Sequence, residues 1–240
     1  MLGGTSFTLY YLAARRGLRE LLNDSEFQLF ILIIVAAITT ISTMLIANDV
    51  FDSTLHTVKY AAVQVVSIVT TTGYVAADFN SWPFFCKMIL FSLMLVGGCS
   101  SSAAGGMKII RVLIVFKLIS RGIFIKLHPN AFVSIKLYDK RMSGDVVSKT
   151  VSFVFLYIVV IFAGSILISL DNIDMMGTVS AVVSSLGNIG PMLSESGLAT
   201  GYAIFSYPSK LLLSLLMLMG RLELFTVLMI LTPGFWTQSR

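Results

Sequence analysis

Two short segments combine hydroxyl side chains with a glycine inside otherwise apolar sequence. The first contains Thr70, Thr71, Thr72, Gly73 and Tyr74, and the second contains Ser185, Leu186, Gly187, Asn188 and Ile189. A cation that has lost its hydration shell needs oxygen ligands, and rings of backbone carbonyls supply them without a full negative charge. Glycine adopts positive φ readily, which lets successive carbonyls point the same way. The sequence therefore predicts two cation-binding turns, with neighbouring hydroxyls as further oxygen ligands.

A third segment has the composition of an interrupted helix. Residues 97–106 are only Gly, Cys, Ser and Ala, and the candidate gating residues among them are Gly97, Gly98, Ser100, Ser101, Ser102, Gly105 and Gly106. Each glycine disfavours a helix by about 1 kcal/mol relative to alanine. We therefore expect a broken, mobile segment at membrane depth. The alternative is a tight helix-packing surface built from small residues.

One charged residue stands within the last apolar run. Arg221 aligns with Gly98 when the two halves of the chain are superposed on their matching lysines, Lys87 and Lys210. A charge at membrane depth is costly and is by default a functional candidate. Arg221 is expected to set an electrostatic barrier or to hold the glycine-rich segment by hydrogen bonds. A structural pair with Glu223 is the alternative.

The elements that position these residues are expected to be membrane helices. The chain is 56% hydrophobic and 12% charged, whereas a soluble domain has about 25% charged residues. Charge-free runs of about 18 residues or more are membrane-span candidates, and they cover 27–48, 60–77, 88–107, 150–170 and 175–194. His56 and His128 have no partner cluster, so no other metal site and no cofactor are predicted. Nucleic acid is not expected as a partner.

Basic residues predict the orientation of the spans. Nine of the 17 Lys and Arg lie in residues 108–149, and Arg15, Arg16 and Arg19 precede the first apolar run. Basic loops stay in the cytoplasm, so residues 1–25 and the 108–149 linker are expected on the inner side. No cleavable signal peptide is predicted. The chain is expected to go out over 27–47, to return by about residue 108, to go out again over 150–170 and to return over 208–232. These crossings leave one extra apolar run in each half. Each extra run is therefore expected to be a re-entrant hairpin from the outer side.

The two halves also match as an internal repeat. Lys87 precedes Met94-Leu95-Val96-Gly97 by the same interval that separates Lys210 from Met217-Leu218-Met219-Gly220, an offset of 123 residues. Thr70–Gly73 is matched with Ser184–Gly187 at an offset of 114. We expect re-entrant helices over 54–69 and 174–183, each ending at a turn. The C-terminal end of a helix carries partial negative charge, which favours a cation.

Four motifs in order carry a family resemblance. Thr70–Tyr74 resembles a filter segment of the TrkH/KtrB/HKT potassium transporter superfamily, and 97–108 resembles its glycine- and serine-rich break. Met219–Glu223 resembles the signature of its fourth repeat, and Gly3–Phe7 resembles the stretch that closes its second repeat. The chain is thus similar to the C-terminal half of a TrkH-like subunit.

The resemblance implies an all-α integral membrane fold with two potassium-channel-like M1–P-loop–M2 repeats. The expected segments are 1–25 as the end of a preceding repeat, 26–118 as one repeat, 119–145 as a cytoplasmic linker and 146–234 as the next repeat. It also implies that the glycine- and serine-rich break is a loop beneath the filter that gates flow. It further implies K+ as the transported ion, dimeric assembly, a multi-pass location in the bacterial inner membrane, and a cytosolic nucleotide-binding regulatory subunit of the TrkA/KtrA kind. The linker is expected to dock that subunit or to lie on anionic lipid.

Such a filter needs four segments and this chain carries two. A truncated product or a split gene is therefore expected. The chain then either is inactive, pairs with a chain that carries the first two repeats, or forms the pore as a homodimer. A non-conducting membrane scaffold or assembly subunit is the main alternative from another class. An intramembrane enzyme is poorly supported, because no paired carboxylates, histidine cluster or serine–base spacing lies in the spans.

Overall fold

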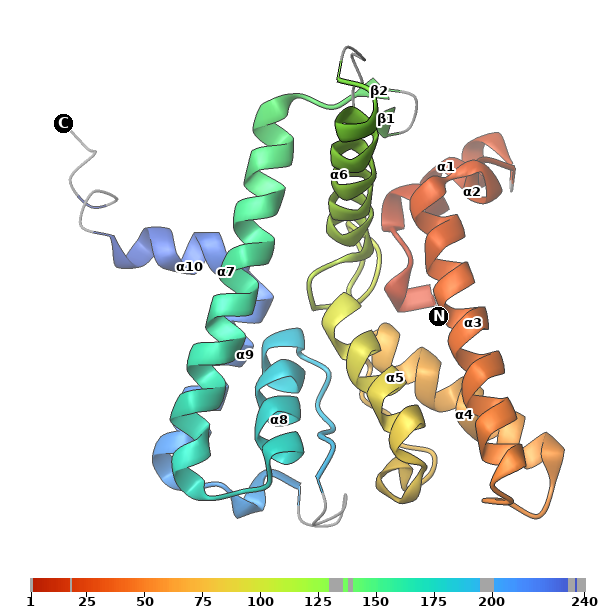
Figure 1. Cartoon of the computed structure of the whole chain (residues 1–240), viewed down its shortest axis with the longest axis vertical. Helices are drawn as coiled ribbons and strands as arrows, with labels where there is room; N and C mark the ends of the chain where they lie inside the picture. Colours follow the sequence, from red (N-terminus) through yellow and green to blue (C-terminus); the bar gives the residue numbers. More distant parts are fainter. Residues whose placement is uncertain are drawn as a thin grey trace.

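The computed structural model describes residues 2–17, 19–129, 136–137, 140–194, 201–232 and 236. Parts of the predicted segments 1–25, 119–145 and 146–234 lie outside the described residues. Within the described ranges the chain is almost entirely helical, and its elements follow the order expected of two consecutive units (Figure 1).

The first unit contains one long helix and three shorter ones. Helix α3 (Ser25–Ala47) runs down one side of the molecule, and α4 (Thr54–Val69) turns back beside it (Figure 1). A 3-10 turn, η2 (Phe79–Ser81), leads into α5 (Phe84–Val96), and α6 (Ile109–Leu127) follows after a gap in helical structure. The predicted bounds of the helix over 54–69 are confirmed.

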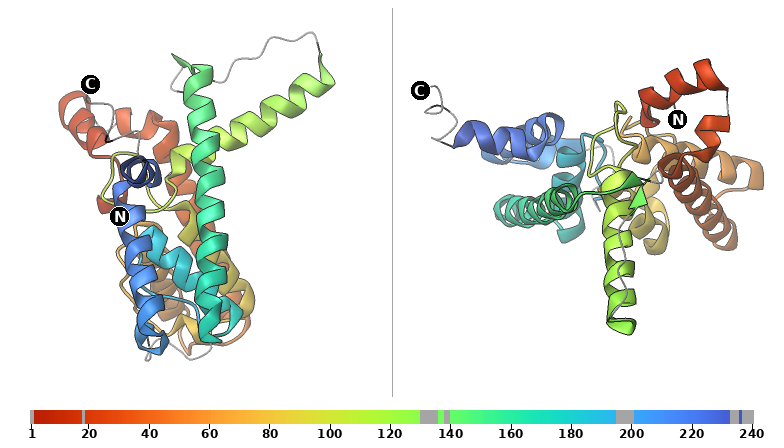
Figure 2. Two further views of the ribbon diagram at one scale, coloured as in Figure 1. Left: turned by 90° about the vertical axis from the view of Figure 1, so that its left-hand side faces the viewer. Right: turned by 90° about the horizontal axis from the view of Figure 1, so that it is seen from above.

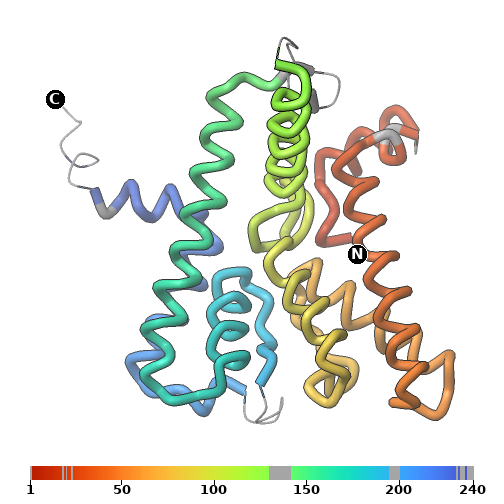
Figure 3. Tube along the Cα trace, in the orientation of Figure 1, coloured from red at the N-terminus to blue at the C-terminus, as the bar shows by residue number. Residues whose placement is uncertain are grey.

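The second unit repeats this order. Helix α7 (Gly144–Ile168) ends in η3 (Ser169–Asp171), and α8 (Met175–Gly187) turns back from the same end of the molecule as α4 does (Figure 3). The turn η4 (Gly201–Ile204) precedes α9 (Tyr207–Leu222) and α10 (Leu224–Leu231). The expectation that the helix over 174–183 stops at Val183 is wrong, because α8 continues for one more turn through Gly187.

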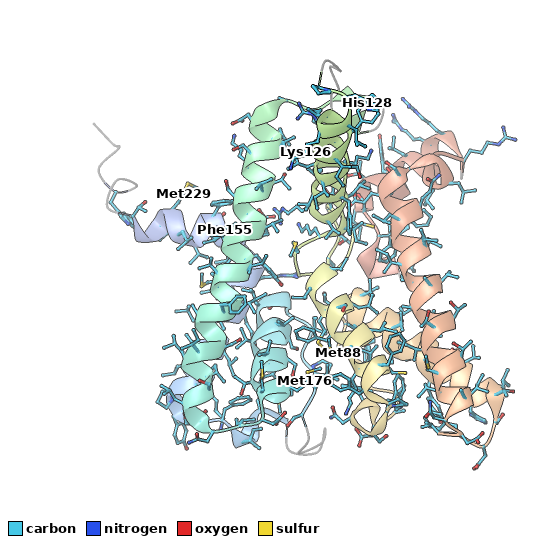
Figure 4. The ribbon with its side chains drawn as sticks, in the orientation of Figure 1. Met88, Lys126, His128, Phe155, Met176 and Met229 are labelled. Carbon is cyan, nitrogen blue, oxygen red and sulfur yellow. The ribbon has the colours of Figure 1, made fainter. Side chains whose placement is uncertain are left out.

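The basic segments gather at the opposite end. Helices α1 (Phe7–Arg16) and α2 (Arg19–Asn23), preceded by η1 (Leu2–Gly4), lie at the end that also holds the tip of α6 (Figure 1). The two-residue strands β1 (Lys136–Leu137) and β2 (Lys140–Arg141) pair antiparallel there. Lys126 and His128 mark this tip in Figure 4. The grouping agrees with the predicted placement of both basic segments on one side.

Both return helices are broken. Helices α5 and α6 are separated by residues 97–108, which we call the gate loop. Helices α9 and α10 meet at a bend of 109°, and α10 runs crosswise to the bundle (Figure 1). The predicted crossing over 208–232 therefore has a sharp bend. Its cause lies at Glu223, whose φ of 65° is left-handed and cannot continue an α-helix.

Each unit has its own apolar core. One buried cluster is centred on α3, α4 and α5 and includes Phe30, Leu90 and Trp82. The other is centred on α7, α8 and α9 and includes Tyr157 and Leu216. Large apolar side chains also cover the outside of the bundle, among them Leu32, Phe155, Phe162, Ile166 and Leu211. Such a broad apolar exterior is typical of a surface that contacts lipid or another protein.

Two of the described helices have the length and hydropathy of membrane spans. These are Ser25–Ala47 and Gly144–Asp171, and the bent pair α9–α10 would make a third. Helix α6 leaves the bundle at an angle after the gate loop (Figure 2).

The matching lysines make matching contacts. Lys87 Nζ donates to the Asn80 carbonyl at 3.2 Å, and Lys210 Nζ donates to the Ala203 carbonyl at 3.3 Å. Each acceptor lies seven residues before its lysine, in η2 or η4, so the offset of 123 residues holds in three dimensions. These lysines tie the turn before each return helix to that helix.

Candidate functional site

The first predicted turn is a hydrogen-bonded cap on the C-terminal end of α4. Thr71 has a left-handed φ of 51° and Gly73 a φ of 72°. The Thr72 N–H donates to the Ser67 carbonyl at 3.0 Å, and the Thr70 hydroxyl donates to the Val66 carbonyl at 2.7 Å. The turn is therefore non-helical, as predicted, and two of its hydroxyls are tied back to the helix rather than pointing freely into space.

The second turn caps α8 in the same way. Asn188 has a left-handed φ of 53° and Gly190 a φ of 110°. The Ile189 N–H donates to the Ser184 carbonyl at 2.9 Å, and the Gly190 N–H donates to Ser184 Oγ at 3.0 Å. The Asn188 side-chain amide also donates to the Met217 carbonyl of α9 at 3.1 Å. The turn is thus held by its own helix and by the return helix.

These conformations correct the register of the repeat. The pairs Thr71 and Asn188, Gly73 and Gly190, and Ser67 and Ser184 each lie 117 residues apart, not 114. The predicted match of Thr70–Gly73 with Ser184–Gly187 is therefore one helical turn out. Ser185, Leu186 and Gly187 lie in the last turn of α8, whereas Asn188 and Ile189 lie in the cap itself. The segment equivalent to 70–74 is 187–191.

A ladder of polar side chains supports the second turn and has no counterpart in the first. Ser180 Oγ donates to the Leu193 carbonyl and accepts from the Leu193 N–H, both at 2.9 Å. Ser194 Oγ donates to Asp174 at 3.1 Å. These bonds hold residues 189–194 along α8. At the register of 117, the residue that corresponds to Ser180 is Val63, whose side chain is exposed.

The two turns lie side by side. A Cβ atom on Gly73 would overlap the Ile189 carbonyl oxygen and would contact Pro191 Cδ at 3.4 Å. At the end of the molecule beyond the turns, the Ser194 N–H donates to Asn80 Oδ1 at 3.2 Å and joins the two units again. Tyr74 is 75% exposed, so its side chain does not brace the other turn within this chain.

The gate loop reaches both turns. The Gly105 N–H donates to Thr71 Oγ1 at 2.9 Å. A Cβ on Gly105 would overlap the Gly187 carbonyl at the end of α8. Gly97 and Gly106 have φ of 73° and 79° and lie against each other at the two ends of the loop. The predicted break in the helix is therefore present, and it places the loop directly against the ends of α4 and α8.

The N-terminal segment holds the loop on one side. The Cys99 and Ala103 N–H groups donate to the Gly4 and Gly3 carbonyls at 2.9 and 3.1 Å, and the Phe7 N–H donates to the Ser101 carbonyl at 3.1 Å. Inside the loop, Ser102 Oγ donates to the Cys99 carbonyl. The alternative of a continuous small-residue packing helix is wrong, because residues 97–108 form no helix.

Arg221 holds the loop from α9. Its Nη1 donates to the Ala103 carbonyl at 2.9 Å. The ion pairs of Glu223 within the described residues go to Lys108 Nζ at 3.5 Å and Arg111 Nη2 at 3.3 Å, not to Arg221. Arg111 also stacks over the Phe153 ring at 3.6 Å. Arg221, Glu223, Gly105 and Tyr157 line a cavity of about 130 Å³ at this place.

Close approach to α8 explains the glycine that precedes Arg221. A Cβ on Gly220 would overlap the Leu186 carbonyl and would lie 2.9 Å from the Asn188 side-chain nitrogen. Glycine therefore lets α9 pack directly on the end of α8, which places Arg221 beside the loop.

Sequence reasoning missed several residues of this site. Glu26 accepts from Ser100 of the gate loop, Lys108 is the last residue of that loop, and Arg111 donates to the Met107 carbonyl. None of the three was a candidate. A signal was available for Glu26, which is an acidic residue at the start of an apolar run of membrane-spanning length. The ion pairs of Lys108 and Arg111 join residues more than 100 positions apart and have no local pattern.

Comparison with known proteins yields one family. Residues 2–233 match the TrkH family, described as cation transport protein. The chain is 32% identical over 239 residues to the Trk system potassium uptake protein TrkH of Salmonella typhimurium, covering 99% of this chain and 49% of that protein. It is 33% identical over 239 residues to the Trk system potassium uptake protein TrkI of Halomonas elongata, covering 98% and 48%.

A solved structure agrees in fold. The crystal structure of the potassium transporter TrkH from Vibrio parahaemolyticus superposes with a TM-score of 0.90 at 32% identity and covers 98% of this chain and 50% of that one. The chain therefore spans about half the length of the relatives that it matches.

Proposed function

The chain belongs to the TrkH family of cation transport proteins, and from that premise we propose that it forms two of the four repeats of a potassium-conducting pore in a bacterial inner membrane. In this proposal α4 and α8 are re-entrant pore helices. Segments 26–118 and 146–234 are the two M1–P-loop–M2 repeats, 1–25 is the end of a preceding repeat, and 119–145 is a cytoplasmic linker. Multi-pass insertion accounts for the apolar exterior of α3, α7 and α9.

One observation supports the pore most strongly. Two short helices end side by side, and each ends in the same kind of cap. In each cap a residue with left-handed φ is followed two positions later by a glycine of positive φ. The C-terminal ends of both helices carry partial negative charge and attract a cation. The backbone carbonyls of 70–74 and 187–191 are then the oxygen ligands of a dehydrated K+. The revised second filter segment replaces the predicted 185–189 by moving two residues along the chain.

The gate loop is placed to control this path. Gly105 contacts Thr71 of the first turn and the Gly187 carbonyl at the end of α8. A loop in this position blocks an ion that leaves the filter, and its glycines allow it to change conformation. Arg221 adds positive charge beside the same path and fixes Ala103. We assign to it both predicted roles, the electrostatic barrier and the hydrogen bond that holds the loop.

Two repeats leave half of the filter open. The missing repeats would pack on the exposed Tyr74 and on the apolar surface of α4 beside it. Val63, Val66 and Thr70 line that surface. A chain that carries the first two repeats, or a second copy of this chain, is the proposed pore partner. A cytosolic nucleotide-binding regulatory subunit is the proposed partner of the basic end, at the tip of α6.

The test is a pair of glycine substitutions in the assembled transporter. Gly73→Ala strains a left-handed position and drives a Cβ into the Ile189 carbonyl, so potassium uptake in uptake-deficient cells is expected to fall by about tenfold or more. Gly122→Ala in α6, where a Cβ meets nothing within 4 Å, is the matched control and leaves uptake unchanged.

The same experiment separates the pore from a scaffold. A scaffold has no ion path, so Gly73→Ala would leave uptake unchanged in a complex that Gly122→Ala also leaves active. That result would overturn the proposal. Membrane abundance of both variants is measured in parallel, so that a loss of uptake is assigned to the pore and not to a loss of protein.

A further inference from the structure

Glu26 is a buried carboxylate at the start of a membrane-spanning helix. It lies in the first turn of α3, and only 1% of its surface is exposed. Asp24 already caps this helix by accepting from the Phe27 N–H at 2.8 Å, so Glu26 is not needed as the cap. A charge in such a place is expensive unless it is hydrogen-bonded, and within a membrane span it points to a function.

Two hydrogen bonds join Glu26 to the gate loop. Its Oε1 accepts from the Ser100 N–H, and its Oε2 accepts from the Ser100 hydroxyl at 2.6 Å. Both oxygens of one carboxylate are therefore directed at one residue, 74 positions further along the chain. Hydrogen bonds to an ionised acceptor are about twice as strong as those between neutral groups, so Ser100 is the most firmly held point of the loop on this side.

Hydrogen bonds inside the loop connect the Ser100 region to the part of the loop that contacts the turns. Ser102 Oγ donates to the Cys99 carbonyl, and the Ala104 N–H donates to Ser102 Oγ at 3.3 Å. These bonds make 99–104 a compact turn, so a fixed Ser100 also fixes the position of Gly105. Gly105 is the residue that donates to Thr71.

We propose that Glu26 is a positioning residue that latches the gate loop beneath the two turns through its paired hydrogen bonds to Ser100. This latch deepens the proposed function, since it assigns a control point to the same pore. Arg221 holds Ala103 from the second unit, so the loop is fixed between an anion of α3 and a cation of α9. The loop cannot leave the ion path until Ser100 separates from Glu26.

The latch makes a prediction that needs no ion flux. Cys99 lies next to Ser100 and is fully buried, whereas Cys86 is buried in α5, outside the loop. Release of the loop exposes Cys99 and leaves Cys86 covered. The reaction of each thiol with N-ethylmaleimide therefore reports separately on the loop, in a Cys86→Ala background, and on the helix bundle, in a Cys99→Ala background.

The test compares Glu26→Gln and Ser100→Ala with the control Ser92→Ala in α5, outside the gate loop, whose side chain is exposed and donates to the Met88 carbonyl of its own helix. Glutamine keeps the shape but places an N–H donor where one acceptor was. Glu26→Gln is expected to raise the Cys99 labelling rate by about tenfold, the factor that corresponds to losing one charge-assisted hydrogen bond. Ser100→Ala raises it as well, and the double variant exceeds Glu26→Gln only slightly, because the two residues share one interaction. Ser92→Ala leaves the rate unchanged.

Two outcomes would overturn the latch. One is an unchanged Cys99 rate in Glu26→Gln, and the other is an equal rise at Cys86, which would mean general loosening of the fold. In the assembled transporter Glu26→Gln is also expected to raise potassium flux in the absence of activation. If no variant conducts while Cys99 alone becomes reactive, the proposed function fails and the latch stands.

Discussion

Lys108 and Glu223 occupy the breaks of the two broken helices, and their side chains pair across 3.5 Å. Both are non-glycine residues with positive φ, of 72° and 65°. Lys108 ends the gate loop and starts α6, while Glu223 separates α9 from α10. The two places at which the return helices change direction are thus joined directly.

Reversing the charge of Glu223 is expected to loosen this junction. Glu223→Lys removes the pairs with Lys108 and Arg111 and replaces attraction by repulsion. These groups are partly exposed, so each pair contributes about 1 kcal/mol or less. The thermal unfolding midpoint of the purified protein is expected to fall by a few degrees. Lys108→Glu combined with Glu223→Lys recovers part of the loss, and a double variant no more stable than the single one would contradict the pairing.

The corrected register predicts different responses from two nearby glycines. Gly190 has a φ of 110°, which alanine adopts only with strain of about 1–3 kcal/mol. Gly187 lies in the last turn of α8, where the nearest atoms to a new Cβ are those of the flexible Ile189 side chain at 3.2 Å. Potassium uptake is therefore expected to fall in Gly190→Ala and to persist in Gly187→Ala. If uptake instead fell in Gly187→Ala and persisted in Gly190→Ala, the result would support the offset of 114.

Gly220 is expected to be essential for stability. Gly220→Ala forces a Cβ into the Leu186 carbonyl, which is backbone and cannot rotate away. Helix α9 must then move off α8, and a loss of about 1–3 kcal/mol is expected from the strain. Chemical denaturation in detergent measures it. Gly122→Ala serves as the control, since an unobstructed alanine in a helix stabilises by up to about 1 kcal/mol.

The polar support of the second turn predicts an asymmetry between two matched serines. Ser184→Ala removes the acceptor of the Gly190 N–H at 3.0 Å, whereas Ser67 Oγ accepts only a long bond of 3.4 Å from the Thr72 hydroxyl. This bond is partly buried, so its loss costs up to about 1 kcal/mol. Ser184→Ala is expected to weaken discrimination between K+ and Na+ in competition uptake more than Ser67→Ala does. Equal effects would argue against a specific role for this bond.

Much of the fold follows from local sequence. The runs of apolar residues predict where helices lie, and the helix over 54–69 has the predicted bounds. Pro83 directly precedes α5 and Pro208 lies in the first turn of α9, which are the positions that proline favours at a helix start. The glycines of 97–106 predict the gate loop, because their cost to a helix is a local property. The matched lysines predict the repeat, since each makes its contact within its own unit.

The remainder depends on contacts between distant residues. The end of α8 was misplaced because Ser-Ser-Leu-Gly resembles Thr-Thr-Thr-Gly by composition, while the position of the cap is set by Asn188, which adopts the left-handed conformation and bonds to α9. The bend at Glu223 depends on Lys108 and Arg111, more than 100 residues away. The role of Glu26 depends on Ser100. No local pattern distinguishes these partners from other charged or hydroxyl residues.

Helix α6 continues directly from the last residue of the gate loop and projects from the bundle (Figure 2). Its 19 residues make a rigid rod about 28 Å long. Lys108 lies at the end of this rod beside the bundle, and Lys126 lies near the other end. In the proposed function, a regulatory partner that binds the end near Lys126 and tilts α6 also moves Lys108, the last residue of the gate loop.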